Sequence, residues 1–471
     1  MNTNMKEINT MRATEVKQNK MGIMPIPKLL LNMGLPMMVS MLGQALYNVV
    51  DTFFVSHMAD AAGIENIGDK AINALTLAYP VQMLIIAFGV GTGVGINALL
   101  SRSLGEGDKE KASKIAGNAI AISLIYFVVT VLFGVFGAKA FILSQTKDLV
   151  IAWMGTTYLR IVTIFSLGTI GYMCVEKIVM ATGNTVATMI GQLSGAVTNI
   201  ILDPIMIYGL LGCPVLGVAG AAWATIIGQF VSLIVIIIFL IHDNKEIRLG
   251  IRFLRFEKHI VRNIFSVGLP AIIMQILVPV MSYAMNLILG TISASAVTAY
   301  GVYYKLQNFI FMPAYGLNNA SIPIISFNYG AQMKKRISDA IKYALCYVTV
   351  IMLLGFLLLQ IFAKQIVGVF SIADESTRLC VLALRIITCG FIFAGINIIL
   401  QGVCQAMGKG IYSLIISLLR FLIIALPLAY IFSLLQSGSS YVWVALPIAE
   451  GIACVTAIAL TKKAYKSRNA A

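Results

Sequence analysis

The sequence predicts an all-α polytopic membrane protein in which twelve transmembrane helices form two six-helix lobes. Three observations support this fold class. Of 471 residues, 59% are hydrophobic and only 11% are charged, apolar runs recur along the chain, and the two halves of the chain resemble each other. A typical soluble domain has about 25% charged residues. The composition therefore excludes an ordinary soluble fold.

Twelve hydrophobic runs have the ~20 residues that a helix needs to cross the hydrocarbon core of a bilayer. We expect the spans at residues 28–57, 71–101, 115–143, 150–181, 185–210, 215–241, 259–290, 296–327, 339–363, 379–407, 410–435 and 440–461.

The net charge of +15 comes mainly from lysines and arginines in the loops on one side of the membrane. If the N-terminus is inside, 24 of the 34 lysines and arginines lie in cytoplasmic segments and 5 lie in outer loops. This bias is the positive-inside rule. We therefore expect a protein of the cell inner (cytoplasmic) membrane with both termini in the cytoplasm, and no nucleic-acid partner.

Neither the N-terminal segment nor the cysteines indicate a secreted protein. The segment 1–27 contains no apolar run, so we expect no cleaved secretory signal. The seven cysteines are scattered without paired spacings, which argues against a disulfide framework or a zinc site.

The chain contains an internal repeat. Tyr79, Gln82 and Ser101 are matched by Tyr304, Gln307 and Ser326, and the offset in residue number is the same for all three pairs. We expect a cytoplasmic tail at 1–27, an N-lobe at 28–241, a linker at 242–258, a C-lobe at 259–461 and a second tail at 462–471. Each lobe has an even number of spans, so both insert the same way up and are related by a pseudo-twofold along the membrane normal.

The polar residues of the two lobes do not match. Asp51 in the first span is paired with Met285 by the repeat, and Asp203 in the fifth span is paired with Leu428. Burying an ionisable group in hydrocarbon costs at least ~2.5 kcal/mol, so such groups usually face a bundle interior or a wet cavity. The N-lobe therefore holds two candidate functional carboxylates that the C-lobe lacks.

Each carboxylate lies on a polar stripe of its helix. Gln44, Tyr47 and Asn48 share a face with Asp51, and Gln192 and Asn199 share a face with Asp203. At 1.5 Å per residue, Asp51 lies about 35 Å and Asp203 about 28 Å from the inner surface, which predicts similar depths. The alternative is that these polar groups only hold helices together.

Two nearby carboxylates in a low-dielectric cavity do not easily ionise together. One of them is expected to take up a proton, or both to share Na⁺ with the amide oxygen of Asn199. Pro36 removes one backbone hydrogen bond from the first helix, and is a candidate hinge.

Two further acids lie in the spans. Glu176 is next to Lys177, so it either forms a partly solvated ion pair or lines a vestibule for cationic drugs. Glu450 is the only acid embedded in the C-lobe; it either pairs with Lys305 or Arg420, or attracts cations to the cavity.

Several motifs give the chain a family resemblance. They are GLP and YNVVDT in the first span, TNIILDP at 198–204, GVAGAAWAT at 217–225, FNYGA at 327–331 and LQGVCQAMGKG at 400–410. In their order and spacing the chain resembles the multidrug and toxic compound extrusion (MATE) family, in particular its bacterial MepA-like branch.

The resemblance implies that Asp51, Asn199 and Asp203 form an N-lobe cation site, and that the first helix kinks at Pro36. We add Thr225, at the end of the GVAGAAWAT motif, to the expected substrate cavity. The NorM-like branch of the family also uses acids in its seventh and tenth helices. This chain has none at 260–290 or 379–407, so we do not expect that second sodium site.

The expected function is therefore export of amphipathic, often cationic drugs in exchange for H⁺ or Na⁺, by a monomer in the lipid bilayer without a cofactor. A lipid-linked oligosaccharide flippase of the same superfamily is the alternative. No hydrolase, Walker or metalloprotease motif is present, so we do not expect an enzyme.

Overall fold

The computed structural model describes residues 19–58, 66–244, 246–248, 250, 253–370, 372–435 and 441–469. Within these ranges the regular secondary structure is entirely helical, which confirms the predicted all-α class. Of the two predicted tails, the segments 1–18 and 470–471 lie outside the described residues.

The N-terminal half begins with a short helix, α2 (Lys20–Ile23), which precedes the long helices. The predicted spans of this half correspond to α3 (Ile26–Ser56), α4 (Ile67–Gly105), α5 (Lys109–Leu132) with α6 (Ala138–Leu143), α7 (Leu149–Ile164) with α8 (Leu167–Ala181), α9 (Thr185–Tyr208) and α10 (Val218–His242).

The C-terminal half repeats this order. Its spans are α11 (Lys258–Gly290), α12 (Ala294–Gly330), α13 (Lys334–Ile361) with α14 (Ala363–Gly368), α15 (Asp374–Ile387) with α16 (Phe391–Ala406), α17 (Gly410–Leu418) with α18 (Ala425–Ser433), and α20 (Ala445–Asn469).

The predicted count of twelve spans is only partly confirmed. In the described part of the chain, ten helices are long and apolar enough to cross a membrane, and α7 with α8, bent by 44°, makes an eleventh. The predicted span at 296–327 corresponds to α12, which is 37 residues long but is not among them. The physical reason is its polar stretch at 303–308, YYKLQN, which interrupts the apolar run.

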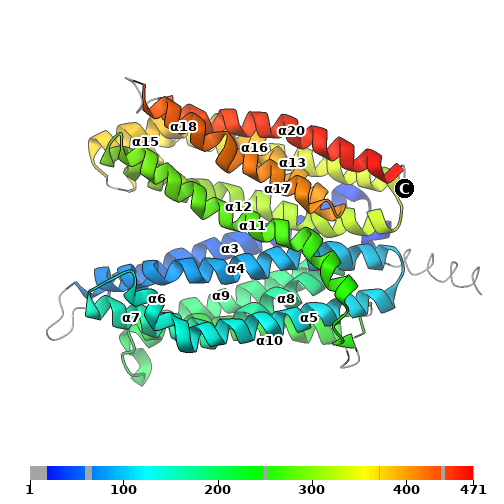
Figure 1. The fold of residues 1–471 in the computed structure, drawn as a ribbon, viewed down its shortest axis with the longest axis horizontal. Coiled ribbons are helices and arrows are strands. Elements are labelled where there is room, and N and C mark those ends of the chain that lie inside the picture. Colours follow the sequence, from blue (N-terminus) through cyan, green and yellow to red (C-terminus); the bar gives the residue numbers. More distant parts are fainter. Residues whose placement is uncertain are drawn as a thin grey trace, which may run out of the picture.

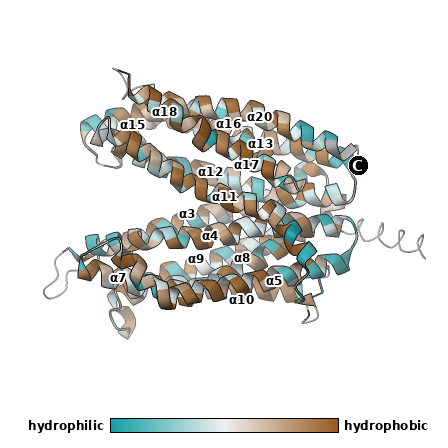
Figure 2. Cartoon of the chain, in the orientation of Figure 1, coloured by the Kyte–Doolittle hydropathy of each residue, from teal (hydrophilic) through white to brown (hydrophobic). Residues whose placement is uncertain are grey.

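Figure 1 shows the helices as two bundles, with α3–α10 in one and α11–α20 in the other. We call the end of the molecule where α3 begins and α20 ends the base; the bundles converge there and diverge toward the opposite end (Figure 1). Across the bundles, α4 packs mainly on α11, and α3 packs mainly on α12. Brown, hydrophobic segments dominate the middle of the helices, and teal, hydrophilic residues collect toward the ends (Figure 2). This distribution suits a lipid-facing surface.

The two lobes touch closely near the base because small residues remove the barrier between backbones. A Cβ on Gly95 of α4 would collide with the carbonyl oxygen of Ile264 on α11, and one on Gly330 of α12 would collide with the carbonyl oxygen of Arg102. Glycine at these positions is therefore required by the inter-lobe packing.

The repeat is also visible in the hydrogen bonds. Ser101 Oγ donates to the carbonyl oxygen of Ala181 at 3.0 Å, and Ser326 Oγ donates to the carbonyl oxygen of Ala406 at 3.1 Å. Both bonds tie the second span of a lobe to the end of its fourth span. The sequence matches at a constant offset thus correspond to equivalent contacts.

Candidate functional site

The N-lobe site is built on α9 and α10. Asp203 is fully buried on α9, and Asn199, one turn earlier, donates from Nδ2 to Asp203 Oδ1 at 3.2 Å. Asn199 Nδ2 is also 3.5 Å from Thr225 Oγ1 on α10. A Cβ on Gly228 would meet the carbonyl oxygen of Gly195 at 2.7 Å, so this glycine pair lets the two helices approach closely enough for the contact.

The first helix brings the second carboxylate to this place. The side chain of Asp51 on α3 lies beside that of Asp203 and interacts with it. A carboxylate can accept but not donate a hydrogen bond, so this contact becomes a hydrogen bond only when one of the two groups carries a proton. The phenols of Tyr47 and Tyr158 lie close enough to interact electrostatically with both acids.

Three oxygens of this cluster lack a partner. Asp51 Oδ1, Asn199 Oδ1 and Asp203 Oδ2 are buried and accept no hydrogen bond from any residue that the structure describes. A buried polar group without a partner costs roughly 1 to 3 kcal/mol, and more when it is charged. The oxygens therefore form a set of acceptors that a proton, or a small hard cation with oxygen ligands, would satisfy.

Three of the expected cavity residues gather here with Asn199 of the expected cation site. Tyr47, Gln192, Asn199 and Thr225 line a small cavity of about 10 Å³, together with Gln229 and Ser232 on α10. This volume is close to the minimum for one water molecule. Six of the nine lining residues have polar side chains, which could bind a water molecule.

Two members of the predicted polar stripe do not line this cavity. Gln44 is half-buried and Asn48 is exposed, and neither lines either of the two pockets described here. The assignment of these two residues to the substrate cavity therefore stays a prediction.

Pro36, the predicted helix hinge, does not interrupt the helix that contains it. α3 runs as one continuous helix from Ile26 to Ser56, with Pro36 inside it. Neighbouring turns maintain the helix although Pro36 donates no hydrogen bond. Bending at Pro36 stays a prediction.

Glu176 lies away from both pockets. It pairs with its neighbour Lys177, with Nζ 3.2 Å from Oε2, and the two residues are 8% and 4% exposed. The pair is buried, so the expectation of a partly solvated pair is wrong. Its place explains the burial, since the Lys177 stem lies against Gly93 of α4, where a Cβ would overlap it.

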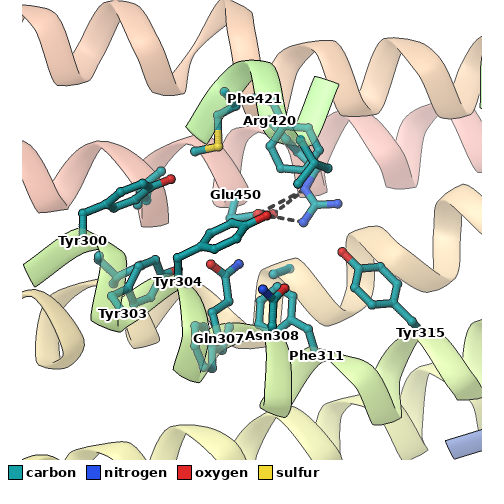
Figure 3. A pocket seen from close by; sticks show the side chains of 17 residues that line it. Tyr300, Tyr303, Tyr304, Gln307, Asn308, Phe311, Tyr315, Arg420, Phe421 and Glu450 are labelled. Carbon is teal, nitrogen blue, oxygen red and sulfur yellow. Dashed lines mark hydrogen bonds and ion pairs between the residues drawn. The ribbon is translucent and has the colours of Figure 1, made fainter. Parts of the chain in front are cut away.

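The C-lobe has its own polar centre. Glu450 on α20 binds Arg420 through two nitrogens, with Nε 2.8 Å from Oε2 and Nη2 2.8 Å from Oε1 (Figure 3). Asn397 Nδ2 donates to Glu450 Oε2 at 2.7 Å. Of the two expected partners, Lys305 is exposed and Arg420 makes the pair. Arg420 lies in a π-helical turn, Leu419–Ile423, a feature that often marks functional sites.

Aromatic and amide side chains surround this ion pair. They line a cavity of about 60 Å³ together with Arg420 and Glu450, and Figure 3 shows their arrangement. The labelled members from α12 are Tyr300, Tyr303, Tyr304, Gln307, Asn308, Phe311 and Tyr315. The cavity holds a few water molecules or one small group of a ligand.

The structure adds residues that the sequence did not single out. Tyr158 on α7 is 4% exposed and accepts a hydrogen bond from Gln82 Nε2 at 3.0 Å, beside the two aspartates. Asn397 supports Glu450 in the other lobe. Gln82 was visible as a repeated position, but nothing in the sequence linked it to Tyr158, which lies two spans further along the chain.

Comparison with known proteins agrees with this arrangement. The MatE family model matches residues 36–205 and 270–431. The chain is 27% identical over 443 residues to the multidrug export protein MepA of Staphylococcus aureus (strain MSSA476), covering 92% of this chain and 93% of that protein. It is 27% identical over 451 residues to MepA of Staphylococcus haemolyticus (strain JCSC1435), covering 94% of each.

A solved structure described as the outward-facing conformation of a multidrug resistance MATE family transporter of the MOP superfamily has the same fold. It superposes with a TM-score of 0.88 at 24% identity, over 95% of this chain and 98% of that one. The family model covers more than half of the chain and the fold agrees. This multi-pass membrane protein therefore belongs to the MatE family, as its motifs predicted.

Proposed function

We propose that this protein is a secondary active multidrug exporter, which moves amphipathic and often cationic compounds out of the cell in exchange for H⁺ or Na⁺. The substrate class comes from similarity to proteins named as multidrug export proteins over more than nine-tenths of their length. The coupling comes from the N-lobe site.

The observation that carries the coupling is the set of three buried oxygens without a hydrogen-bond partner among the described residues: Asp51 Oδ1, Asn199 Oδ1 and Asp203 Oδ2. Two adjacent acids in a dry environment favour binding one positive charge. Asp51 and Asp203 belong to different helices, so the charge between them also controls how closely α3 and α9 can pack. Ion binding is thereby linked to helix position.

In the proposed cycle, an ion from outside binds the two aspartates and draws α3 toward α9. Bending at Pro36 accompanies this movement, and the substrate is displaced from the acids of the N-lobe site. The lobes then rock, the base opens and the ion leaves to the inside. A cationic substrate competes with the ion for the same acids, which makes the exchange obligatory.

The membrane orientation is part of the proposal. The excess of basic residues in the segments at the base supports an orientation in the cell membrane with the base and both termini on the cytoplasmic side. We retain the lobe boundaries 28–241 and 259–461, and a monomer as the functional unit.

A flippase for lipid-linked oligosaccharides is the second candidate, because Arg420 places a cation beside the C-lobe cavity. A pyrophosphate-linked lipid needs uncompensated positive charge. Arg420 is already neutralised by Glu450, so the pocket is a poor anion site. The exporter is therefore preferred.

The test uses purified protein in proteoliposomes loaded with a fluorescent organic cation. A pH gradient alone and then a sodium gradient alone would be applied. Efflux driven by either gradient supports the exporter and identifies the ion. If neither gradient moves the cation, and a fluorescent lipid-linked sugar crosses the bilayer, the flippase replaces it.

A further inference from the structure

Two short segments near the base have corresponding places in the two lobes. Strap A comprises residues 19–25, contains α2 and leads into α3, the first span of the N-lobe. Strap B comprises residues 253–257 and leads into α11, the first span of the C-lobe. Neither segment takes part in the polar sites described above.

Strap A is bound by the C-lobe. Arg336 Nη2 on α13 donates to the carbonyl oxygens of Met21 and Met24, each at 2.8 Å. Asn328 Nδ2 at the end of α12 donates to the carbonyl oxygen of Met21 at 3.1 Å, and Asn328 Oδ1 accepts from Arg336 Nε at 2.9 Å. Met21 itself is fully buried. These bonds include a charged donor, which makes them stronger than neutral ones.

Strap A also touches the N-lobe. Asn19 Nδ2 donates to the carbonyl oxygen of Thr182 at 3.4 Å, in the turn between α8 and α9. It also donates to Glu246 Oε1 at 2.6 Å, in the segment that joins the lobes. Strap A is thus held between the two lobes at the base.

Strap B is bound in the opposite sense, by the N-lobe. Asn118 on α5 donates from Nδ2 to the carbonyl oxygen of Arg255 at 3.2 Å and accepts from the backbone N–H of Glu257 at 2.9 Å. Lys114 Nζ is 3.7 Å from Glu257 Oε1. A Cβ on Gly117 would overlap the carbonyl oxygen of Phe253, so strap B lies directly on α5.

The two arrangements are equivalent under the repeat. Each strap precedes the first span of one lobe and is held by the third span of the other lobe, α13 for strap A and α5 for strap B. When the lobes separate at the base, α3 moves away from α13 and α11 moves away from α5. The hydrogen bonds of both straps cannot all survive that movement.

We propose that the two straps form a latch that holds the base closed, and that the latch must release before the base can open. The inference rests on the rocking motion of the proposed function. It goes beyond the family similarity because it concerns contacts outside the ion and drug sites. The hydrogen bonds satisfy strap backbone groups that would otherwise need water, so breaking them raises the population with an open base.

The test measures the distance between spin labels at Glu110 and Lys342, exposed positions on α5 and α13, in a cysteine-free background reconstituted in nanodiscs. Asn118→Ala removes both bonds of its side chain to strap B, and Arg336→Gln removes the charged donor to strap A. We expect each to raise the fraction of long distances about tenfold. The combined variant should raise it further. Lys335→Gln, an exposed neighbour of Arg336 with the same loss of charge, should leave the distribution unchanged.

The outcomes separate the latch from the rocking motion. If the unsubstituted protein opens at the base and neither strap variant changes that population, the latch is wrong while rocking stands. If no condition ever produces long distances at the base, the rocking motion itself is wrong. If Arg336→Gln does not fold, Asn118→Ala tests the latch from the other lobe.

Discussion

The two lobes repeat the same fold but treat buried charge in opposite ways. In the N-lobe, Asp51 and Asp203 lie side by side without a cation among the described residues of their cluster. In the C-lobe, Glu450 is bound by Arg420 and Asn397. In the proposed function, the N-lobe therefore takes its positive charge from outside the protein, whereas the C-lobe supplies its own.

The comparison teaches that embedded acids alone do not identify a coupling site. The charge of a buried carboxylate is neutralised when an arginine pairs with it. Removing one partner then lowers the stability of the fold, because the other charge stays buried without a counter-ion. A pair of acids without a partner remains ready to exchange an ion. The predictions below test this difference.

The largest effect is expected at the N-lobe acids. Asp203→Asn or Asp51→Asn removes one negative charge from the cluster, so the ion loses its binding site. Ion-driven drug export should fall to background in an efflux-deficient host, while the protein still inserts and folds. Met285→Leu, a volume-conserving change at the repeat partner of Asp51, is the control and should retain export. Full export by both aspartate variants would remove the coupling role from this site.

The C-lobe pair should affect stability rather than coupling. Arg420→Gln leaves the half-buried Glu450 without its cation and should destabilise the protein by about 3 kcal/mol, the low end for breaking a buried pair. The double variant Arg420→Gln with Glu450→Gln removes both charges and should recover most of the loss. Thermal unfolding of the purified protein measures both. If the double variant unfolds at the same temperature as the single one, the loss of stability does not come from an unpaired charge on Glu450, and this prediction is wrong.

Asn199→Ala tests the third oxygen of the N-lobe cluster. It removes the hydrogen bond to Asp203 and one candidate ligand for the ion, so half-maximal transport should require about tenfold more of the driving ion. The measurement is drug efflux against ion concentration in proteoliposomes. Asn397→Ala removes the amide that binds Glu450 in the C-lobe. It should leave the ion dependence of transport unchanged.

The smallest effect is expected at Tyr158. Tyr158→Phe keeps the ring but removes the hydroxyl that Gln82 binds, which costs about 1 kcal/mol and a few-fold in ion affinity. Tyr315→Phe in the C-lobe cavity is the matched change and should not alter the ion dependence. Equal effects of the two variants would mean that the phenols influence transport only through general packing.

Much of this picture follows from the sequence. The helical class, the repeat, and the proximity of Asp51 and Asp203 all arise from local patterns: hydrophobic length, a constant spacing between matches, and a fixed rise per residue. Arg420 was one of two candidate partners for Glu450. These features can be predicted from the residues within each helix, without knowing how the helices pack together.

Features that depend on how helices rotate against each other were not predictable. Asn48 shares a stripe with Asp51, but the packing of α3 leaves it out of the small cavity beside the two aspartates. Tyr158 and Gln82 belong to different spans, and no local sequence pattern predicts that they contact each other. The straps likewise depend on the lobes crossing at the base, since Asn328 and Met21 come from opposite halves of the chain.

The central claim is that coupling resides in the N-lobe acids alone. The most direct measurement is gradient-driven efflux from proteoliposomes containing either Asp51→Asn with Asp203→Asn or Arg420→Gln with Glu450→Gln. We expect the first variant to lose all response to the ion gradient although it still inserts and folds, and the second to keep the response. A gradient response that survives in the first variant and disappears in a folded second variant would contradict the account.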